Sequence, residues 1–110
     1  MRFFRADRVS KLIREELSMI IMRELDFGGA LVTVTGVDVD KKLEHAATLV
    51  SVIPSAAEER AMRELERHAG RLQHLLMKKI NIKPMPRVSF VLDHGSENAA
   101  KIEKLLEEGQ

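Results

Sequence analysis

The 110-residue sequence predicts an α+β fold in which helices cover one face of a small sheet. Apolar residues recur at helical spacing near the amino terminus and again between residues 60 and 79. Residues 31–53 instead alternate between apolar and polar side chains, and a similar alternation returns at residues 88–92. The predicted order is therefore α-β-β-α-β-α. A chain of this length forms one core, so we expect a single domain over residues 1–110 with an ordered core from about 5 to 107.

The first helix is predicted from about Ala6 to Glu24. Its apolar residues recur at steps of three and four: Val9, Leu12, Ile13, Leu17, Ile20 and Ile21. The segment Asp26-Phe27-Gly28-Gly29 ends this helix, and the β-branched residues of Leu31 to Val39 are typical of a strand. The alternation in this strand changes phase at Gly36, which predicts a β-bulge there.

The second strand is predicted at Ala46 to Ile53, after the polar connection from Asp40 to Glu44. The short connection predicts that the first two strands form an antiparallel hairpin. Pro54 ends the second strand. Ser55, followed three residues later by Glu58, has the pattern of a capping box that opens the next helix.

That second helix is predicted to continue to about Lys79, and Pro84 and Pro86 prevent any further extension. A third strand follows at Val88 to Leu92, and Ser96 opens a final helix. Periodicity does not decide whether the third strand pairs parallel or antiparallel. Asp93 and His94 stand before Gly95 and Ser96, a pattern more typical of a turn into a capped helix than of an acid–base pair, so no catalytic residue is predicted.

The helix between the second and third strands carries a basic stripe. Its members follow one another at steps of three or four residues, so they lie within roughly 80° of arc on one helix face: Arg60, Arg63, Arg67, Arg71, His74 and Lys78. The apolar residues of the same turns point the opposite way, which leaves the basic face for an anionic partner. Gly70 lies in the middle of the stripe. Because glycine costs about 1 kcal/mol relative to alanine within a helix, its position predicts a kink or a close backbone approach to a ligand.

Charge is segregated along the chain, although the net charge is only +1. Residues 1–14 hold five basic residues and one acidic residue, and residues 60–87 hold eight basic and two acidic residues. The remaining segments are acidic. This distribution favours a surface that binds nucleic acid, while the alternative that the basic side chains only solvate a helix face stays open.

Composition narrows the other classes of function. The chain has no cysteine, which excludes disulfides and thiolate metal ligands and fits a reducing compartment. No apolar run has the length of a membrane span, and the charged amino terminus is unlike a signal peptide, so we expect a cytoplasmic protein. The four histidines lack metal-ligand spacing, and we predict no metal, no other cofactor and no small-molecule substrate.

Several segments, taken in order and spacing, follow a known pattern. They are the helix from Arg8 to Leu25 with Asp26 after it, the strand Val32-Thr33-Val34-Thr35-Gly36-Val37, the alternating strand from Ala46 to Val52, the glycine within Leu65 to Leu76, Lys78-Lys79-Ile80, and Pro86-Arg87-Val88-Ser89-Phe90 leading to Asp93. In these features the sequence resembles the ribosome-binding factor A family, bacterial small-subunit assembly factors with a KH-like fold of the bacterial type II. The resemblance covers nearly the whole chain.

The resemblance implies a protein that binds the immature small (30S) ribosomal subunit and its 16S ribosomal RNA, assists late maturation and rRNA processing, and is not an enzyme. In this family a kink at Ala-x-Gly replaces the GxxG loop of ordinary KH domains, which places the glycine on Gly70 and puts His68 at the alanine position. The predicted RNA-binding residues are Arg60, Arg63, Arg67, His68, Gly70, Arg71, His74, Lys78, Lys79 and Lys83.

We expect a monomer that contacts RNA phosphates, because a chain with four phenylalanines and no tyrosine or tryptophan offers few platforms for base stacking. Two other classes stay open. One is a generic RNA-binding or DNA-binding module unconnected with ribosomes, and the other is a protein-interaction adaptor whose basic face meets an acidic partner. The sequence also leaves open a special role in cold adaptation.

Overall fold

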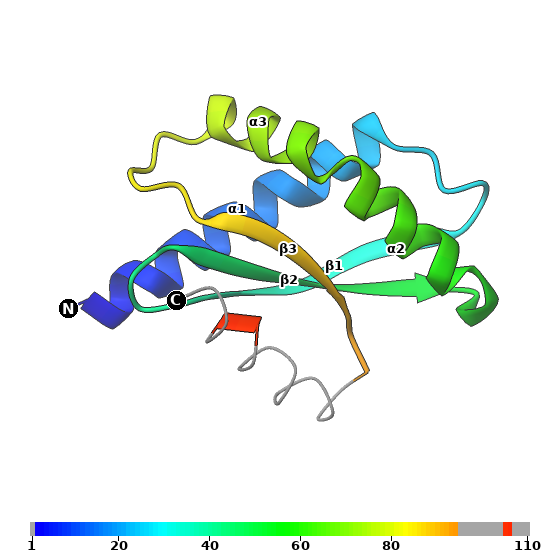
Figure 1. Cartoon of the computed structure of the whole chain (residues 1–110), viewed down its shortest axis with the longest axis horizontal. Coiled ribbons are helices and arrows are strands. Elements are labelled where there is room, and N and C mark those ends of the chain that lie inside the picture. Colours follow the sequence, from blue (N-terminus) through cyan, green and yellow to red (C-terminus); the bar gives the residue numbers. More distant parts are fainter. Residues whose placement is uncertain (1, 95–104, 107–110) are drawn as a thin grey trace.

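The computed structural model describes residues 2–94 and 105–106, which form the KH-like α+β fold shown in Figure 1. The elements are α1 (Arg2–Glu24), β1 (Leu31–Val39), β2 (His45–Ile53), the 3₁₀ helix η1 (Ser55–Ala57), α2 (Glu58–Arg67), α3 (Ala69–Lys79) and β3 (Arg87–Leu92). The predicted order is confirmed through β3. The predicted final helix from Ser96 lies outside the described residues except for Leu105 and Leu106, which are helical.

The sheet has the strand order β1-β2-β3. β1 and β2 pair antiparallel, and their register shifts between Val34 and Gly36, which confirms the predicted bulge. β2 and β3 pair parallel, and α2 and α3 together form the long crossover that such a connection needs. The bulge has a packing consequence. Valines before it and valines after it all reach the core, although a regular strand would point the second set to the other face.

The helices α1, α2 and α3 lie over one face of the sheet (Figure 1), and the core fills the space between the two layers. Its largest fully buried aliphatic side chains come from α1, α2, α3 and β2: Ile13, Leu17, Ile20, Leu65, Leu72, Leu76 and Val50. Burial of each such side chain stabilises the fold by about 1.5 to 3 kcal/mol. Because the apolar stripes of α1 and α3 are held against the sheet, their polar stripes are left facing outward.

The predicted capping box is wrong. Ser55 begins the 3₁₀ helix, with the extended residue Pro54 before it, and α2 begins only at Glu58. The residue before α2 is Ala57, which makes no side-chain capping bond. The 3₁₀ turn moves Ser55 away from the position from which a hydroxyl could cap α2. Glu58 and Glu59 instead occupy the first turn of α2, where negative charges interact favourably with the helix dipole.

The predicted kink exists within the His68-x-Gly70 motif that the resemblance implied, but the break lies at His68 and not at Gly70. α2 ends at Arg67, α3 begins at Ala69, and His68 between them has φ −102° and ψ 10°. That backbone conformation belongs to the bridge region, which residues other than glycine can adopt. Gly70 is a helical residue of α3, and among the described residues the glycines with positive φ are Gly28 and Gly29. Apolar periodicity could not locate the break, because Leu65 and Leu72 face the core on either side of it.

None of the helices within the described part of the chain is both long and apolar enough to span a lipid bilayer.

Candidate nucleic-acid interface

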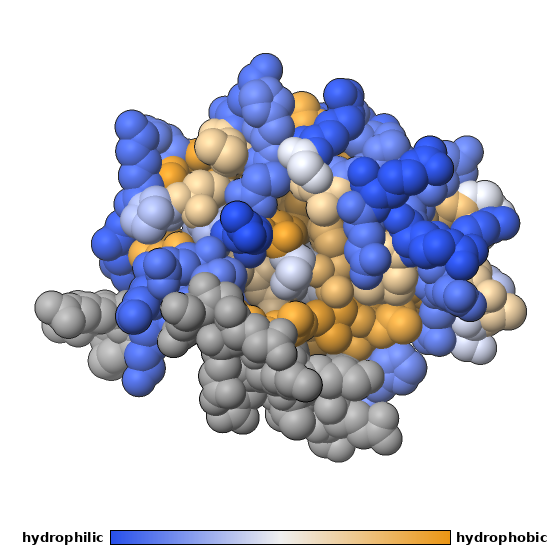
Figure 2. All heavy atoms as spheres, in the orientation of Figure 1, coloured by the Kyte–Doolittle hydropathy of each residue, from blue (hydrophilic) through white to orange (hydrophobic). Residues whose placement is uncertain are grey.

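The basic stripe is divided between two helices by the break at His68. Arg60, Arg63 and Arg67 lie on α2, and all three side chains are exposed. Arg71, His74, Lys78 and Lys79 lie on α3, and Lys83 lies in the loop that follows; these residues are exposed as well. Figure 2 shows strongly hydrophilic residues gathered over α2 and along the helical edge of the molecule. The predicted residues therefore remain on the surface, but they do not form one straight row.

Acidic neighbours offset the positive charge of α2. Its ten residues include the three arginines and four glutamates, and Arg63 Nη1 lies 3.3 Å from Glu59 Oε1 one turn away. Arg60 Nη2 donates a hydrogen bond of 3.0 Å to the carbonyl oxygen of Phe27. The first half of the stripe therefore has a weaker positive potential than the arginine count suggests.

The excess of positive charge lies further along the chain. From Arg67 to Leu92 the sequence contains no acidic residue, and its cations are Arg67, Arg71, Lys78, Lys79, Lys83 and Arg87. We call this stretch the acid-free segment. Lys78 and Lys79 are exposed in the last turn of α3, where positive charges also interact favourably with the helix dipole. Arg87, an exposed residue at the start of β3, was not among the predicted RNA-binding residues, although it lies within the run without acids.

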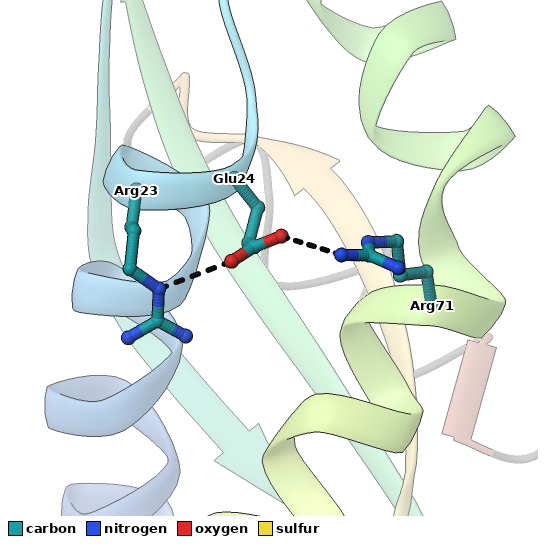
Figure 3. A network of polar contacts seen from close by, with 3 residues as sticks. All are labelled: Arg23, Glu24 and Arg71. Atoms are coloured by element: carbon teal, nitrogen blue, oxygen red, sulfur yellow. Dashed lines mark hydrogen bonds and ion pairs between the residues drawn. The ribbon is translucent and has the colours of Figure 1, made fainter.

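Arg71 has a structural partner, which the sequence did not reveal. Its Nη2 donates a hydrogen bond of 2.8 Å to Oε1 of Glu24 at the end of α1, while Arg23 Nε lies 3.0 Å from Glu24 Oε2 (Figure 3). The hydrogen bond from the Arg71 guanidinium, followed by the smaller effect of the bond from Arg23, holds the pKa of Glu24 below its ordinary value. Arg71 thus links α3 to α1, and Glu24 neutralises part of its charge.

His68, His74 and Gly70 differ in their surroundings. The half-buried His68 places Nε2 at 3.1 Å from Glu64 Oε1, so this ring nitrogen faces a carboxylate. His74 is exposed, and its side chain has no hydrogen-bond partner among the residues that the structure describes. Gly70 is exposed, and a Cβ built on it would meet no atom within 4 Å. At Gly70 the surface of α3 is therefore bare backbone that a ligand can approach closely.

Sequence reasoning passed over one cluster of possible metal ligands, which is formed by Asp40, Glu44 and His45. The carboxylate of Asp40 is buried, and its Oδ1 accepts hydrogen bonds from the backbone N–H of Glu44 at 2.7 Å and of His45 at 3.1 Å. Its Oδ2 lies 3.3 Å from His45 Nδ1. These bonds hold the turn between β1 and β2, and they account for the buried carboxylate without an ion.

Comparison with known proteins identifies the family. The sequence pattern described as "Ribosome-binding factor A" matches residues 5–106. The ribosome-binding factor A of Opitutus terrae is 35% identical over 92% of this chain and 84% of its own length. The crystal structure of ribosome-binding factor A from Thermus thermophilus superposes with a TM-score of 0.70, covers 79% of this chain and 94% of its own, and shares 24% identity.

A second structural relative is described in a complex. It is a homology model of the Thermus thermophilus ribosome-binding factor A, fitted into a cryo-EM map of that protein with the 30S particle. It superposes with a TM-score of 0.67 at 26% identity and covers 78% of this chain and 92% of its own. The match of the family pattern over nearly the whole chain, the identity to curated relatives and the shared fold lead to one conclusion: this chain belongs to the ribosome-binding factor A family.

Proposed function

We propose that this chain binds the immature small ribosomal subunit through its 16S ribosomal RNA and assists the late maturation and rRNA processing of that subunit in the cytoplasm, without catalysing a reaction itself. Membership of the ribosome-binding factor A family supports this proposal, as does the 30S complex described for a relative. The observation that carries it for this chain is the acid-free segment, whose exposed cations extend from the end of α2 along α3 and its connection to the start of β3.

The cations without an acidic partner are the ones we assign to RNA phosphates. Five cations of the acid-free segment have exposed side chains that make no ion pair among the described residues: Arg67, Lys78, Lys79, Lys83 and Arg87. Each contact with a phosphate releases condensed counterions, so these side chains supply affinity that falls with salt. Arg63 and Arg71 contribute less net charge, because each is paired with a glutamate of the protein. Arg60 keeps its charge, but its side chain is bonded to the carbonyl oxygen of Phe27.

Gly70, His68 and His74 complete the proposed surface. The bare backbone at Gly70 lets an RNA strand approach α3 more closely than any side chain would allow. His74 can donate a hydrogen bond to a phosphate, and so can His68 if its ring turns away from Glu64. Phosphate contacts do not read the base sequence, so recognition of the subunit would rest mainly on the shape of its RNA.

Reversal of charge in the acid-free segment tests the proposal. We expect Arg67→Glu with Lys78→Glu to abolish cosedimentation with immature small subunits, while the melting temperature stays close to that of the wild type, because exposed substitutions usually cost under about 0.5 kcal/mol. The matched control is Lys41→Glu with Lys42→Glu, which makes the same charge change at exposed positions in the β1–β2 turn. This control should bind normally.

Two results would overturn the proposal. The first is normal binding of the Arg67→Glu, Lys78→Glu variant to immature subunits. The second is copurification of the wild-type chain with a protein complex that survives RNase, because such a complex indicates an adaptor for an acidic protein partner.

A further inference from the structure

The loop between α1 and β1 is a compact turn that lies against α2 (Figure 1). Gly28 and Gly29 have φ values of 65° and 91°, in the left-handed region that favours glycine. Asp26 Oδ1 accepts a hydrogen bond of 2.9 Å from the backbone N–H of Gly28, and the N–H of Ala30 donates to the carbonyl oxygen of Phe27 at 3.3 Å. Gly28 therefore presents backbone without a side chain toward Arg60 of α2.

Arg60 is held against this loop, unlike the other arginines of α2. Its Nη2 donates to the carbonyl oxygen of Phe27 at 3.0 Å, and a Cβ added to Gly28 would collide with the guanidinium. Arg63 forms an ion pair with the exposed Glu59, and Arg67 has no ion-pair partner among the residues described. The bond to Phe27 thus fixes the guanidinium of Arg60 in position, and its remaining N–H donors stay available to a ligand.

Two hollows adjoin this fixed guanidinium, and they differ in chemistry. The first, of about 290 Å³, is lined by Asp26, Phe27, Gly28, Arg60, Ala61 and Glu64. The second, of about 360 Å³, shares Gly28 and Arg60 with the first but is otherwise lined by glycine, alanine and proline. The first hollow thus offers carboxylate acceptors, whereas the second contains one cation and no acidic group.

We propose that one unpaired guanine nucleotide of the bound RNA occupies both hollows, with its base in the first and its phosphate in the second. This inference rests on the proposed function. The Watson–Crick edge of guanine carries adjacent N–H donors, which match the oxygens of a carboxylate, and an arginine guanidinium is a plane on which unpaired bases stack. The same carboxylates repel a phosphate, which leaves the second hollow for that group.

The carboxylates of the first hollow have acceptor capacity to spare. Asp26 uses Oδ1 for the turn, and Glu64 directs Oε1 to His68. Asp26 Oδ2 and Glu64 Oε2 accept no hydrogen bond within the described part of the chain. The site would therefore add a preference for one base to an RNA contact that otherwise rests on phosphates.

Nuclear magnetic resonance with mononucleotides tests this site. We expect guanosine 5′-monophosphate to shift the backbone amide signals of Gly28, Gly29 and Ala61 in the labelled wild-type chain, with an affinity several-fold higher than those of the adenosine, cytidine and uridine monophosphates. Glu64→Gln, which leaves the Arg60 contact intact, should weaken guanosine monophosphate binding by about tenfold, roughly the loss of one charged hydrogen bond.

Arg60→Lys and Arg63→Lys form a matched pair, because each keeps its charge on the same face of α2. Arg60→Lys should lose guanosine monophosphate binding, and Arg63→Lys should retain it. Equal shifts with all four nucleotides, equal behaviour of the two lysine variants, or unchanged binding in Glu64→Gln would overturn the inference. If the wild-type chain fails to bind guanosine monophosphate but still cosediments with small subunits, the proposed nucleotide site is wrong and the proposed function stands. If the chain binds guanosine monophosphate but does not cosediment with small subunits, the proposed function is wrong.

Discussion

Replacement of Gly70 by alanine should stabilise the protein, which reverses what the sequence alone suggested. The glycine interrupts the basic stripe, so the sequence favoured a kink that needs glycine. In the structure Gly70 is a helical residue in the first turn of α3, its φ is not positive, and an added Cβ meets no atom within 4 Å. Nothing in the surroundings therefore opposes a methyl group.

The magnitude follows from the entropy of the unfolded chain. Gly→Ala at a compatible helical site stabilises by about 0.4 to 1 kcal/mol, because alanine has fewer unfolded conformations to lose. For a domain of this size 1 kcal/mol corresponds to about 4 to 8 °C, so we expect the melting temperature to rise by about 2 to 8 °C. Thermal and urea unfolding followed by circular dichroism measure both quantities.

Gly29→Ala is the matched control, because a Cβ at Gly29 also meets nothing within 4 Å while its φ is 91°. Only the backbone conformation differs in kind between the two sites, so Gly29→Ala should destabilise by about 1 to 2 kcal/mol. A fall in stability for Gly70→Ala would refute the helical assignment of Gly70. In the same preparations Gly70→Ala should weaken binding to small subunits, and normal binding would contradict the close approach of RNA to this backbone.

Three further substitutions test other contacts. Gln73→Leu should lower the free energy of unfolding, measured in urea, by about 2 to 4 kcal/mol. The Gln73 side chain donates to the carbonyl oxygen of Pro86 at 2.9 Å and accepts from the backbone N–H of Val88 at 2.8 Å, and both groups would lose their partner. A loss under about 0.5 kcal/mol would show that water replaces the amide. Glu24→Gln should lower the melting temperature most at neutral pH. Because Arg71 lowers the pKa of the Glu24 carboxyl, the ionised carboxylate stabilises the fold above the ordinary pKa of a glutamate, and this stabilisation is lost as the pH falls through the pKa of the folded state. A melting-temperature difference between wild type and variant that stays constant with pH would contradict this pairing. Lys79→Gln should reduce the salt slope of subunit binding by about one, whereas Lys42→Gln should leave it unchanged, and equal slopes would mean that Lys79 only solvates α3.

The contact between Arg71 and Glu24 also guides the choice of variants. Charge reversal at Arg71 would place two carboxylates next to each other at the junction of α1 and α3, so a loss of binding could reflect a damaged fold. Arg67 and Lys78 have no such partner among the described residues, which makes them the cleaner positions for reversal.

The sequence by itself determined the elements whose signals are local. The strand Leu31–Val39 has the predicted bounds, and its bulge at Gly36 was visible as a change in alternation. The sequence also predicted the buried faces of the helices, and Ile13, Leu65 and Leu76 all lie in the core. Side-chain periodicity reports which face of an element is apolar, and this face is decided within a few residues.

Only the tertiary structure decided how those faces meet. Three features depend on contacts between segments far apart in the sequence: the parallel pairing of β2 with β3, the bond from Arg71 to Glu24 and the bond from Arg60 to Phe27. A fourth, the break at His68, depends on backbone angles that leave no periodic pattern in the sequence. The predicted basic residues did reach the surface, because charged side chains are excluded from the core. Packing decided which of these residues have an acidic partner within the described part of the protein, because an ion pair forms only where the fold brings its partners within reach.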